Sequence, residues 1–192
     1  MLYKTLADDG SARHGGTGSW PLPIKSGDGT WTPGDWLDIR DSGKMVACTA
    51  TALHLCRDEQ IISWFGPALY EAEADGLEDA GDKCITQRAR LLRRIEAWDE
   101  RTQRLLACDC AEHVLPLWEA RFPNDKRPRE AIAVARRFAR GEATLEELQA
   151  AWAAACDTAW AATWAAARAA AGDAEHRWQY ERFLDYMEGR LV

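Results

Sequence analysis

Apolar residues in the first 90 positions come in short runs, and glycine, proline or polar turns separate one run from the next. Short runs of this kind predict β-strands, and an apolar run behind a capping residue predicts a helix. The expected strands are 2–6, one or two within 44–56, 69–75 and 84–87, and a short helix is expected over 59–65. Residues 1–90 are therefore predicted to form a small α+β domain with mostly antiparallel strands.

The pattern changes at Arg88, after which apolar residues recur at steps of three and four. This is the period of an amphipathic helix, and it predicts one long helix, or two with a bend, over 88–121. Pro116 lies inside that stretch, so a kink is expected there, because proline removes one backbone hydrogen bond. Further helices are expected over 128–140, 145–171 and 173–188. Residues 91–192 are predicted to form an all-α helical bundle, which makes the fold class α+β.

The helix expected after Thr144 is rich in alanine. Thr144-Leu-Glu-Glu147 has the Thr-x-x-Glu form of a capping box, which predicts where this helix begins. Bulky residues then follow at steps of four and form one stripe: Trp152, Cys156, Trp160 and Trp164. Small residues let helix axes approach closely, so we expect the stripe to pack into the core of the bundle.

The chain has 192 residues, 47% of them hydrophobic and 29% charged, as expected for a folded protein. Its net charge of -7 disfavours contact with phosphate backbones, so no nucleic-acid partner is expected. The chain contains no run of about 18 apolar residues and does not open on a secretion signal, so we expect a cytoplasmic protein with no membrane partner. The glycine-rich stretch 14–18 lacks the ending and spacing of phosphate-binding loops, and no cofactor is expected. The pattern does not indicate the oligomeric state.

His54 and Cys56 lie two residues apart in an expected strand, so their side chains project from one face of the sheet. Such a pair can bind a metal or act as base and nucleophile, with Glu71 or Glu73 lining the same cleft. The alternative is a purely structural pair, a buried cysteine beside a hydrogen-bonded histidine. If the first interpretation holds, the candidate catalytic residues are His54, Cys56 and Glu73.

The stretch 105–131 concentrates two cysteines, a histidine and a charged turn. On a helix, its Cys-x-Cys pair points about 200° apart, so the two thiols cannot hold one metal ion together. Cys110 and His113 do share a face and form an alternative metal site, if two further ligands, such as His176 or Cys156, join them. Otherwise His113 is structural, with its ring hydrogen-bonded to Asp109 or to a loop carbonyl.

The turn 124–129 crowds opposite charges between two expected helices. Guanidinium groups match carboxylates bidentately, so the turn suits internal ion pairs that brace these helices. It equally suits contact with an acidic partner. The residues assigned to this structural or partner-binding corner are Trp118, Asp125, Arg127 and Arg129.

The carboxy-terminal half carries several motifs around its alanine-rich helix. They are Cys110-Ala111-Glu112, Leu115-Pro116-Leu117-Trp118-Glu119, Pro123-Asn124-Asp125-Lys126-Arg127-Pro128 and Trp178-Gln179. Together they resemble the bacterial immunity protein family of polymorphic toxin systems. The resemblance implies a helical domain that protects by binding another protein, a cognate toxin, and it implies no catalysis.

A second set of motifs lies in the amino-terminal half. It comprises Tyr3-Lys4, the loop Trp20–Trp36, Leu53-His54-Leu55-Cys56, Ile61–Phe65, Tyr70–Glu73 and Lys83–Thr86. These features are similar to an uncharacterised domain of phage and prophage-associated bacterial proteins. The resemblance implies no activity, and it supports a domain boundary near residue 90.

These features together predict a non-enzymatic protein that binds and inhibits another protein. The expected partner is a toxin or, in a phage or prophage counter-defence version, a component of a host defence complex. The alternative is an enzyme whose site lies in the amino-terminal α+β domain.

Overall fold

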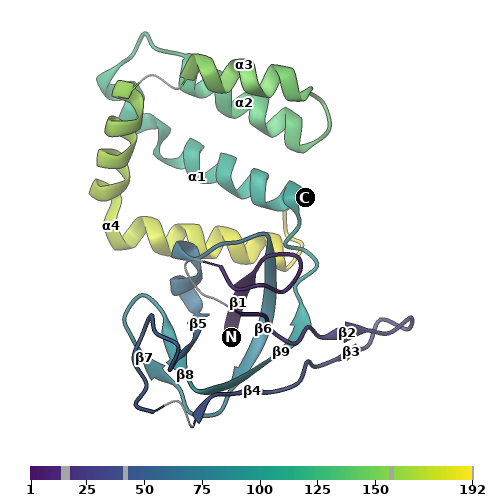
Figure 1. Cartoon of the computed structure of the whole chain (residues 1–192). Coiled ribbons are helices and arrows are strands. Elements are labelled where there is room, and N and C mark those ends of the chain that lie inside the picture. The colour runs from purple at the N-terminus through teal and green to yellow at the C-terminus, as the bar shows by residue number, and fades with distance from the viewer. Residues whose placement is uncertain (14–17, 41–42, 156–157, 192) are drawn as a thin grey trace. The chain divides into compact units, whose positions relative to one another are not determined.

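Strands fill the first part of the chain and helices the second, which confirms the predicted α+β class (Figure 1). The computed structural model describes residues 1–13, 18–40, 43–155 and 158–191, with the backbone alone for 155, 158–171 and 173. Most of the glycine-rich stretch 14–18 lies outside the described residues. Contacts divide the chain into two units, Met1–Trp98 and Asp99–Val192, whereas the predicted boundary near residue 90 falls inside a strand.

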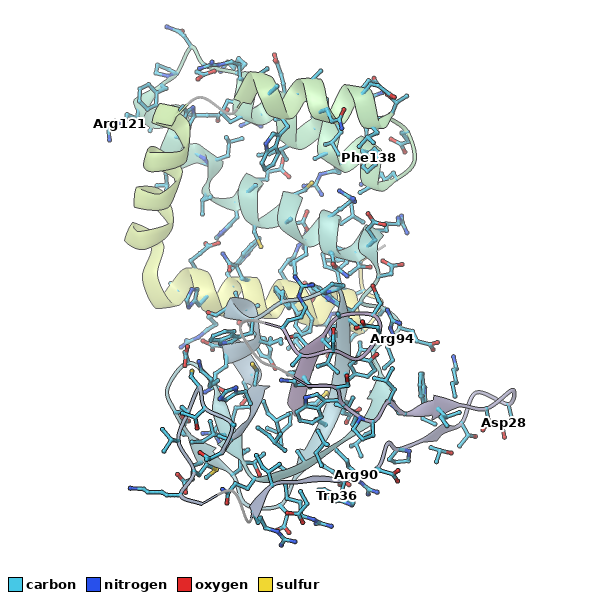
Figure 2. All side chains as sticks on the ribbon, viewed as in Figure 1. Asp28, Trp36, Arg90, Arg94, Arg121 and Phe138 are labelled. Atoms are coloured by element: carbon cyan, nitrogen blue, oxygen red, sulfur yellow. The ribbon has the colours of Figure 1, made fainter. Side chains whose placement is uncertain are left out.

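Seven strands of the first unit form one sheet, in which each strand is antiparallel to its neighbours. They are β1 (Leu2–Leu6), β4 (Leu37–Asp38), β5 (Leu53–Arg57), β6 (Ala68–Ala74), β7 (Glu78–Asp79), β8 (Cys84–Thr86) and β9 (Arg88–Arg94). Their order across the sheet is β4-β9-β6-β1-β5-β8-β7. A separate hairpin pairs β2 (Ile24–Lys25) with β3 (Trp31–Thr32), and Figure 2 shows Asp28 at its tip.

The prediction of a helix from Arg88 was wrong, because residues 88–94 form strand β9. Ala89 and Leu91 are completely buried and lie two residues apart, which is the period of a strand. Leu92 and Ile95 add apolar residues at helical steps, and these hid the strand period in the sequence. Pairing with β6 selects the strand.

Ion pairs link β9 to β6. Arg93 Nε lies 2.6 Å from Glu71 Oε2, and Arg90 pairs with Glu73. The Arg90 guanidinium also lies 4.8 Å from the centre of the Trp36 ring, and Figure 2 shows these two side chains together. Arginines of one strand therefore neutralise the acidic face of the next.

The core of the first unit lies against one face of the sheet. Its buried side chains are Leu6, Leu55, Ala68, Tyr70, Ala72, Ala89 and Leu91, joined by Trp20 from the loop-rich segment. The short helix predicted at 59–65 is a 3-10 helix, η2 (Asp58–Ser63). The predicted strand within 44–56 is confirmed only at its end, because turns occupy much of the segment before Leu53.

The second unit consists of helices. They are α1 (Glu100–Arg121), α2 (Arg127–Ala139), α3 (Leu145–Ala155) and α4 (Thr158–Met187). α1 continues through Pro116. Gly172, at φ 56 and ψ -148, interrupts the helical conformation of α4 at the position where the sequence predicted a break, and Figure 1 shows the bend. No helix in the described part of the chain has the length and apolar content needed to cross a bilayer.

The helix starts follow local chemistry. Asp99 Oδ1 accepts a hydrogen bond of 2.7 Å from the backbone N–H of Thr102, which caps α1. At α3 the predicted capping box is confirmed: Thr144 N–H donates to Glu147 Oε2 at 2.7 Å, and Glu147 N–H donates to Thr144 Oγ1 at 3.2 Å. The short-range signals in the sequence therefore set where these helices begin.

Gly34 fastens the loop-rich segment of the first unit to the sheet. Its N–H donates to the carbonyl of Leu91 in β9 at 2.9 Å. A Cβ at this position would lie 2.2 Å from the carbonyl oxygen of Pro21, far inside van der Waals contact. The close approach of two backbone segments therefore requires glycine here.

Replacing Gly34 by alanine is expected to lower the free energy of unfolding by about 1–3 kcal/mol, because the backbone must move to admit the methyl group. Gly27→Ala is the matched control, since a Cβ there meets nothing within 4 Å. Urea unfolding of both variants measures the difference. Equal midpoints for the two variants would show that the Pro21 contact is not tight.

Candidate functional site

A buried carboxylate on α1 joins three helices of the second unit. Asp109 is 4% exposed. Its Oδ1 accepts from Arg136 Nη1 of α2 at 2.5 Å, and its Oδ2 accepts from Arg182 Nε at 2.6 Å and Tyr186 Oη at 2.8 Å, both of α4. We call Asp109, Arg136, Arg182 and Tyr186 the Asp109 cluster.

The charge of Asp109 depends on these partners. Burial alone would raise the pKa of Asp109, but hydrogen bonds from Arg136, Tyr186 and Arg182 outweigh burial and hold the pKa below its usual range. Burial, and then the bond to Asp109, raise the pKa of Tyr186. The carboxylate is thus ionised and fully engaged, so it is unavailable as a general acid or base.

His113 belongs to a neighbouring cluster rather than to Asp109. Its Nδ1 lies 2.7 Å from Oε2 of Glu175, a buried residue of α4 that also accepts from Gln179 Nε2 at 2.8 Å. The imidazole stacks on Trp178, with 3.7 Å between ring centres and 4° between planes. The prediction that His113 is hydrogen-bonded to Asp109 or to a loop carbonyl was wrong, because His113 is bonded to Glu175. The carboxylate oxygens of Asp109 accept from Arg136 and Arg182 instead.

The alternative metal site at Cys110 and His113 gains no further ligand in the described structure. His113 is hydrogen-bonded to Glu175, and His176 is exposed. Among the residues with described side chains, no group of three or more histidine, cysteine, aspartate or glutamate residues is arranged to hold a metal ion.

The corner between α1 and α2 contains internal ion pairs. Arg127 contacts Asp125 through two bonds of 2.9 and 2.8 Å. Arg129 contacts Glu119 of α1 through two bonds of 2.8 and 2.7 Å. Trp118 is buried, and its ring centre lies 4.4 Å from that of Phe122. Both guanidinium groups are about half exposed, so water screens each pair and each contributes little to stability.

In the first unit, His54 and Cys56 lie in different surroundings. Cys56 is 7% exposed, and burial, more than any other cause, raises its pKa to about 12. His54 Nε2 instead accepts a hydrogen bond of 2.8 Å from the backbone N–H of Cys48. Glu73 pairs with Arg90 across the sheet. The geometry does not make Cys56 an activated nucleophile.

A hollow lined by arginines lies between α1 and α2. It has a volume of about 370 Å³, and Arg129, Arg136, Arg137 and Arg140 line it. Arg129 pairs with Glu119, and Arg137 pairs with Glu147. Arg136 pairs with both Asp109 and Glu112. Internal pairing thus neutralises much of its charge.

An apolar groove lies among α1, α2 and α3. Its volume is about 420 Å³, and alanine side chains, Leu148 and Trp152 supply much of its lining. Trp152 is 63% exposed, so the prediction that it packs into the core was wrong. Cys156 lies outside the described residues, as do the side chains of Trp160 and Trp164. An exposed tryptophan beside an apolar groove is the feature of the second unit best suited to binding a protein.

Residues 93–177 resemble one known family. They match the family model described as "Imm-5 like putative immunity protein". This confirms the resemblance predicted for the carboxy-terminal half, and all residues that line the apolar groove, from Arg104 to Trp152, lie inside the match. The match includes no residue of 1–92, where the similarity to a phage-associated domain stays a prediction. No curated protein and no solved structure matches the chain.

Asp109→Asn is expected to lower the free energy of unfolding by about 3 kcal/mol, because it leaves two guanidinium groups facing a neutral amide in a buried setting. Asp125→Asn is the matched control, and it should cost no more than about 1 kcal/mol, since its partner Arg127 is about half exposed. Denaturant unfolding measures both. Similar losses for the two variants would mean that the Asp109 cluster does not hold the helices.

The lowered pKa of Asp109 also predicts a pH dependence. A carboxylate with a lowered folded-state pKa adds stability above its unfolded pKa of about 3.9, and this is lost as the pH falls through the folded-state pKa. The difference in unfolding free energy between the wild type and Asp109→Asn should stay constant from about pH 5 to 8. It should shrink below about pH 4, and a difference that does not change in acid would contradict the assignment.

Proposed function

We propose that the helical unit is an immunity module that binds a toxin of a polymorphic toxin system and blocks it without chemistry. The observation that supports this most directly is the match of residues 93–177 to an immunity protein family. That match spans α1, α2, α3 and the first part of α4. The proposal therefore concerns the helices and assigns no role to the sheet.

The apolar groove is the proposed contact surface. Exposed tryptophans that border a pocket often carry most of the energy of a protein interface, because one ring buries a large apolar area. Trp152 and Leu145 are 63% and 52% exposed on α3, and the groove beside Trp152 has room for a large apolar side chain of a partner. Because the chain carries a net charge of -7, we expect a basic partner, whose encounter the opposite charge accelerates.

The state of the ionisable groups in this unit supports binding rather than catalysis. Asp109 is saturated by arginines, and Glu175 is shared by His113 and Gln179. Burial raises the pKa of Cys108, so its thiol is a poor nucleophile. These groups are arranged to hold helices together.

The test is affinity capture of the full chain from its native host, with the product of the neighbouring gene as the named candidate. We expect a stable complex with that protein and relief of its toxicity when the two are co-expressed. If the neighbouring protein neither binds nor harms the host, the immunity role fails. If a component of a defence complex is recovered instead, the counter-defence version replaces it.

Trp152→Ala should weaken the complex at least about 30-fold, which corresponds to a hot-spot loss of about 2 kcal/mol. Leu117→Ala is the control, because Leu117 is 52% exposed on α1 and does not line the groove. Isothermal titration with the captured protein measures both affinities. A complex that tolerates Trp152→Ala would place the interface elsewhere on the helical unit.

A further inference from the structure

The arginine-lined hollow between α1 and α2 takes its positive charge from one face of α2. Its four arginines recur at spacings of three, four and seven residues, which places them on one side of the helix. They are Arg129, Arg136, Arg137 and Arg140. The α1 side of the hollow adds one carboxylate, that of Glu112. The charged lining of this hollow of about 370 Å³ therefore consists mainly of hydrogen-bond donors.

Two of these guanidinium groups are fixed by carboxylates of α1. Arg129 donates two bonds to Glu119, at 2.8 and 2.7 Å. Arg136 donates to Asp109 at 2.5 Å and to Glu112 at 2.6 Å. These two arginines form a fixed wall of the hollow and have little need of a ligand.

The other two guanidinium groups are held weakly or not at all. The described bonds of Arg137 use Nη2, which donates to the carbonyl of Glu142 at 2.9 Å and lies 3.4 Å from Glu147 Oε1. The side chains of Arg137 and Glu147 are both about half exposed, so water screens this pair. Arg140 is exposed, and its guanidinium makes no hydrogen bond or ion pair within the described part of the chain.

Helix geometry brings the Arg137 and Arg140 side chains together. Side chains three positions apart on a helix are neighbours, with about 5–6 Å between their Cβ atoms. Arg140 is the C-cap residue of α2, and it keeps a right-handed helical backbone at φ -90 and ψ 0, so it continues the same face. Long helical side chains lean over the preceding turn, which directs both groups along the hollow rather than past the end of α2.

Two converging guanidinium groups suit a phosphate monoester better than a carboxylate. One guanidinium fork already satisfies the two oxygens of a carboxylate. A phosphate monoester has three terminal oxygens and a charge of about -1.5 to -2 at pH 7, so it can accept from both arginines and compete with the single charge of Glu147. The net charge of -7 opposes a long phosphate backbone but does not prevent local binding of one phosphate.

The remaining space in the hollow suits an apolar group attached to that phosphate. Leu115 of α1 and Ile132 of α2 line it beside the arginines. Its volume of about 370 Å³ exceeds what one phosphate needs, and small-molecule sites measure about 300–1,000 Å³. We propose that the hollow binds a small organic phosphate monoester, with Arg137 and Arg140 on the phosphate and Leu115 and Ile132 against the organic part.

The experiment is isothermal titration of the full chain with phenyl phosphate at pH 8, where the monoester is a dianion. Inorganic phosphate and benzoate are the comparison ligands. Phenyl phosphate should bind at least about tenfold tighter than inorganic phosphate, which lacks the apolar group. It should also bind at least about tenfold tighter than benzoate, which lacks the third oxygen and the second charge.

Arg140→Gln should weaken phenyl phosphate binding at least about tenfold, because it removes a charged donor from the phosphate. The variant should unfold at the same temperature as the wild type, since Arg140 is exposed and pairs with no described residue. Arg121→Gln is the matched control: it removes the same charge from an exposed position of α1 outside the hollow. It should leave the affinity unchanged within about twofold.

The proposal is overturned if phenyl phosphate does not bind saturably, or if the Arg140 and Arg121 variants bind it equally well. Benzoate binding as tightly would make the hollow a carboxylate site, and equal affinity for inorganic phosphate would mean an adventitious ion only. Either result also overturns the proposal. Trp152→Ala should leave phenyl phosphate binding unchanged, because Trp152 lines the apolar groove and not this hollow. Failure here is therefore distinct from failure of the proposed immunity function.

Discussion

The helical unit depends on the interaction between the Asp109 carboxylate and its arginine partners. Helices α2 and α4 both direct guanidinium groups at it, and it sits where water cannot screen the attraction. Removing a carboxylate from water is costly, and only complete hydrogen bonding offsets that cost. Because two of its partners come from far along the chain, the cluster closes only when the last helix has docked.

The first unit uses charge differently. Its ion pairs lie across neighbouring strands, as between Arg93 and Glu71, and they remain partly exposed. Such pairs add little stability. Like charges directly opposite each other would be unfavourable, so the ion pairs favour the observed register. The two units thus place ion pairs in different settings, one buried at a helix junction and the other along a sheet.

Local signals in the sequence were sufficient for much of the fold. Thr144 and Glu147 marked a helix start, and Gly172 marked the break in α4, because both effects act within one turn. Long-range pairing could not be predicted from the sequence. Residues 88–94 fit both the helical and the strand period, and only contact with β6 selected the strand. The contacts of His113 could not be predicted for the same reason. His113 and Glu175 are 62 residues apart, so no spacing rule relates them.

The sheet order has a consequence for how this protein meets others. The strands at its two edges, β4 and β7, have two residues each. An edge that short offers few unpaired backbone groups to a strand from another chain, which guards the sheet against extension and aggregation. A partner that recognises proteins by adding a strand would find little template on this sheet, whereas a partner that inserts a side chain between helices would not need one.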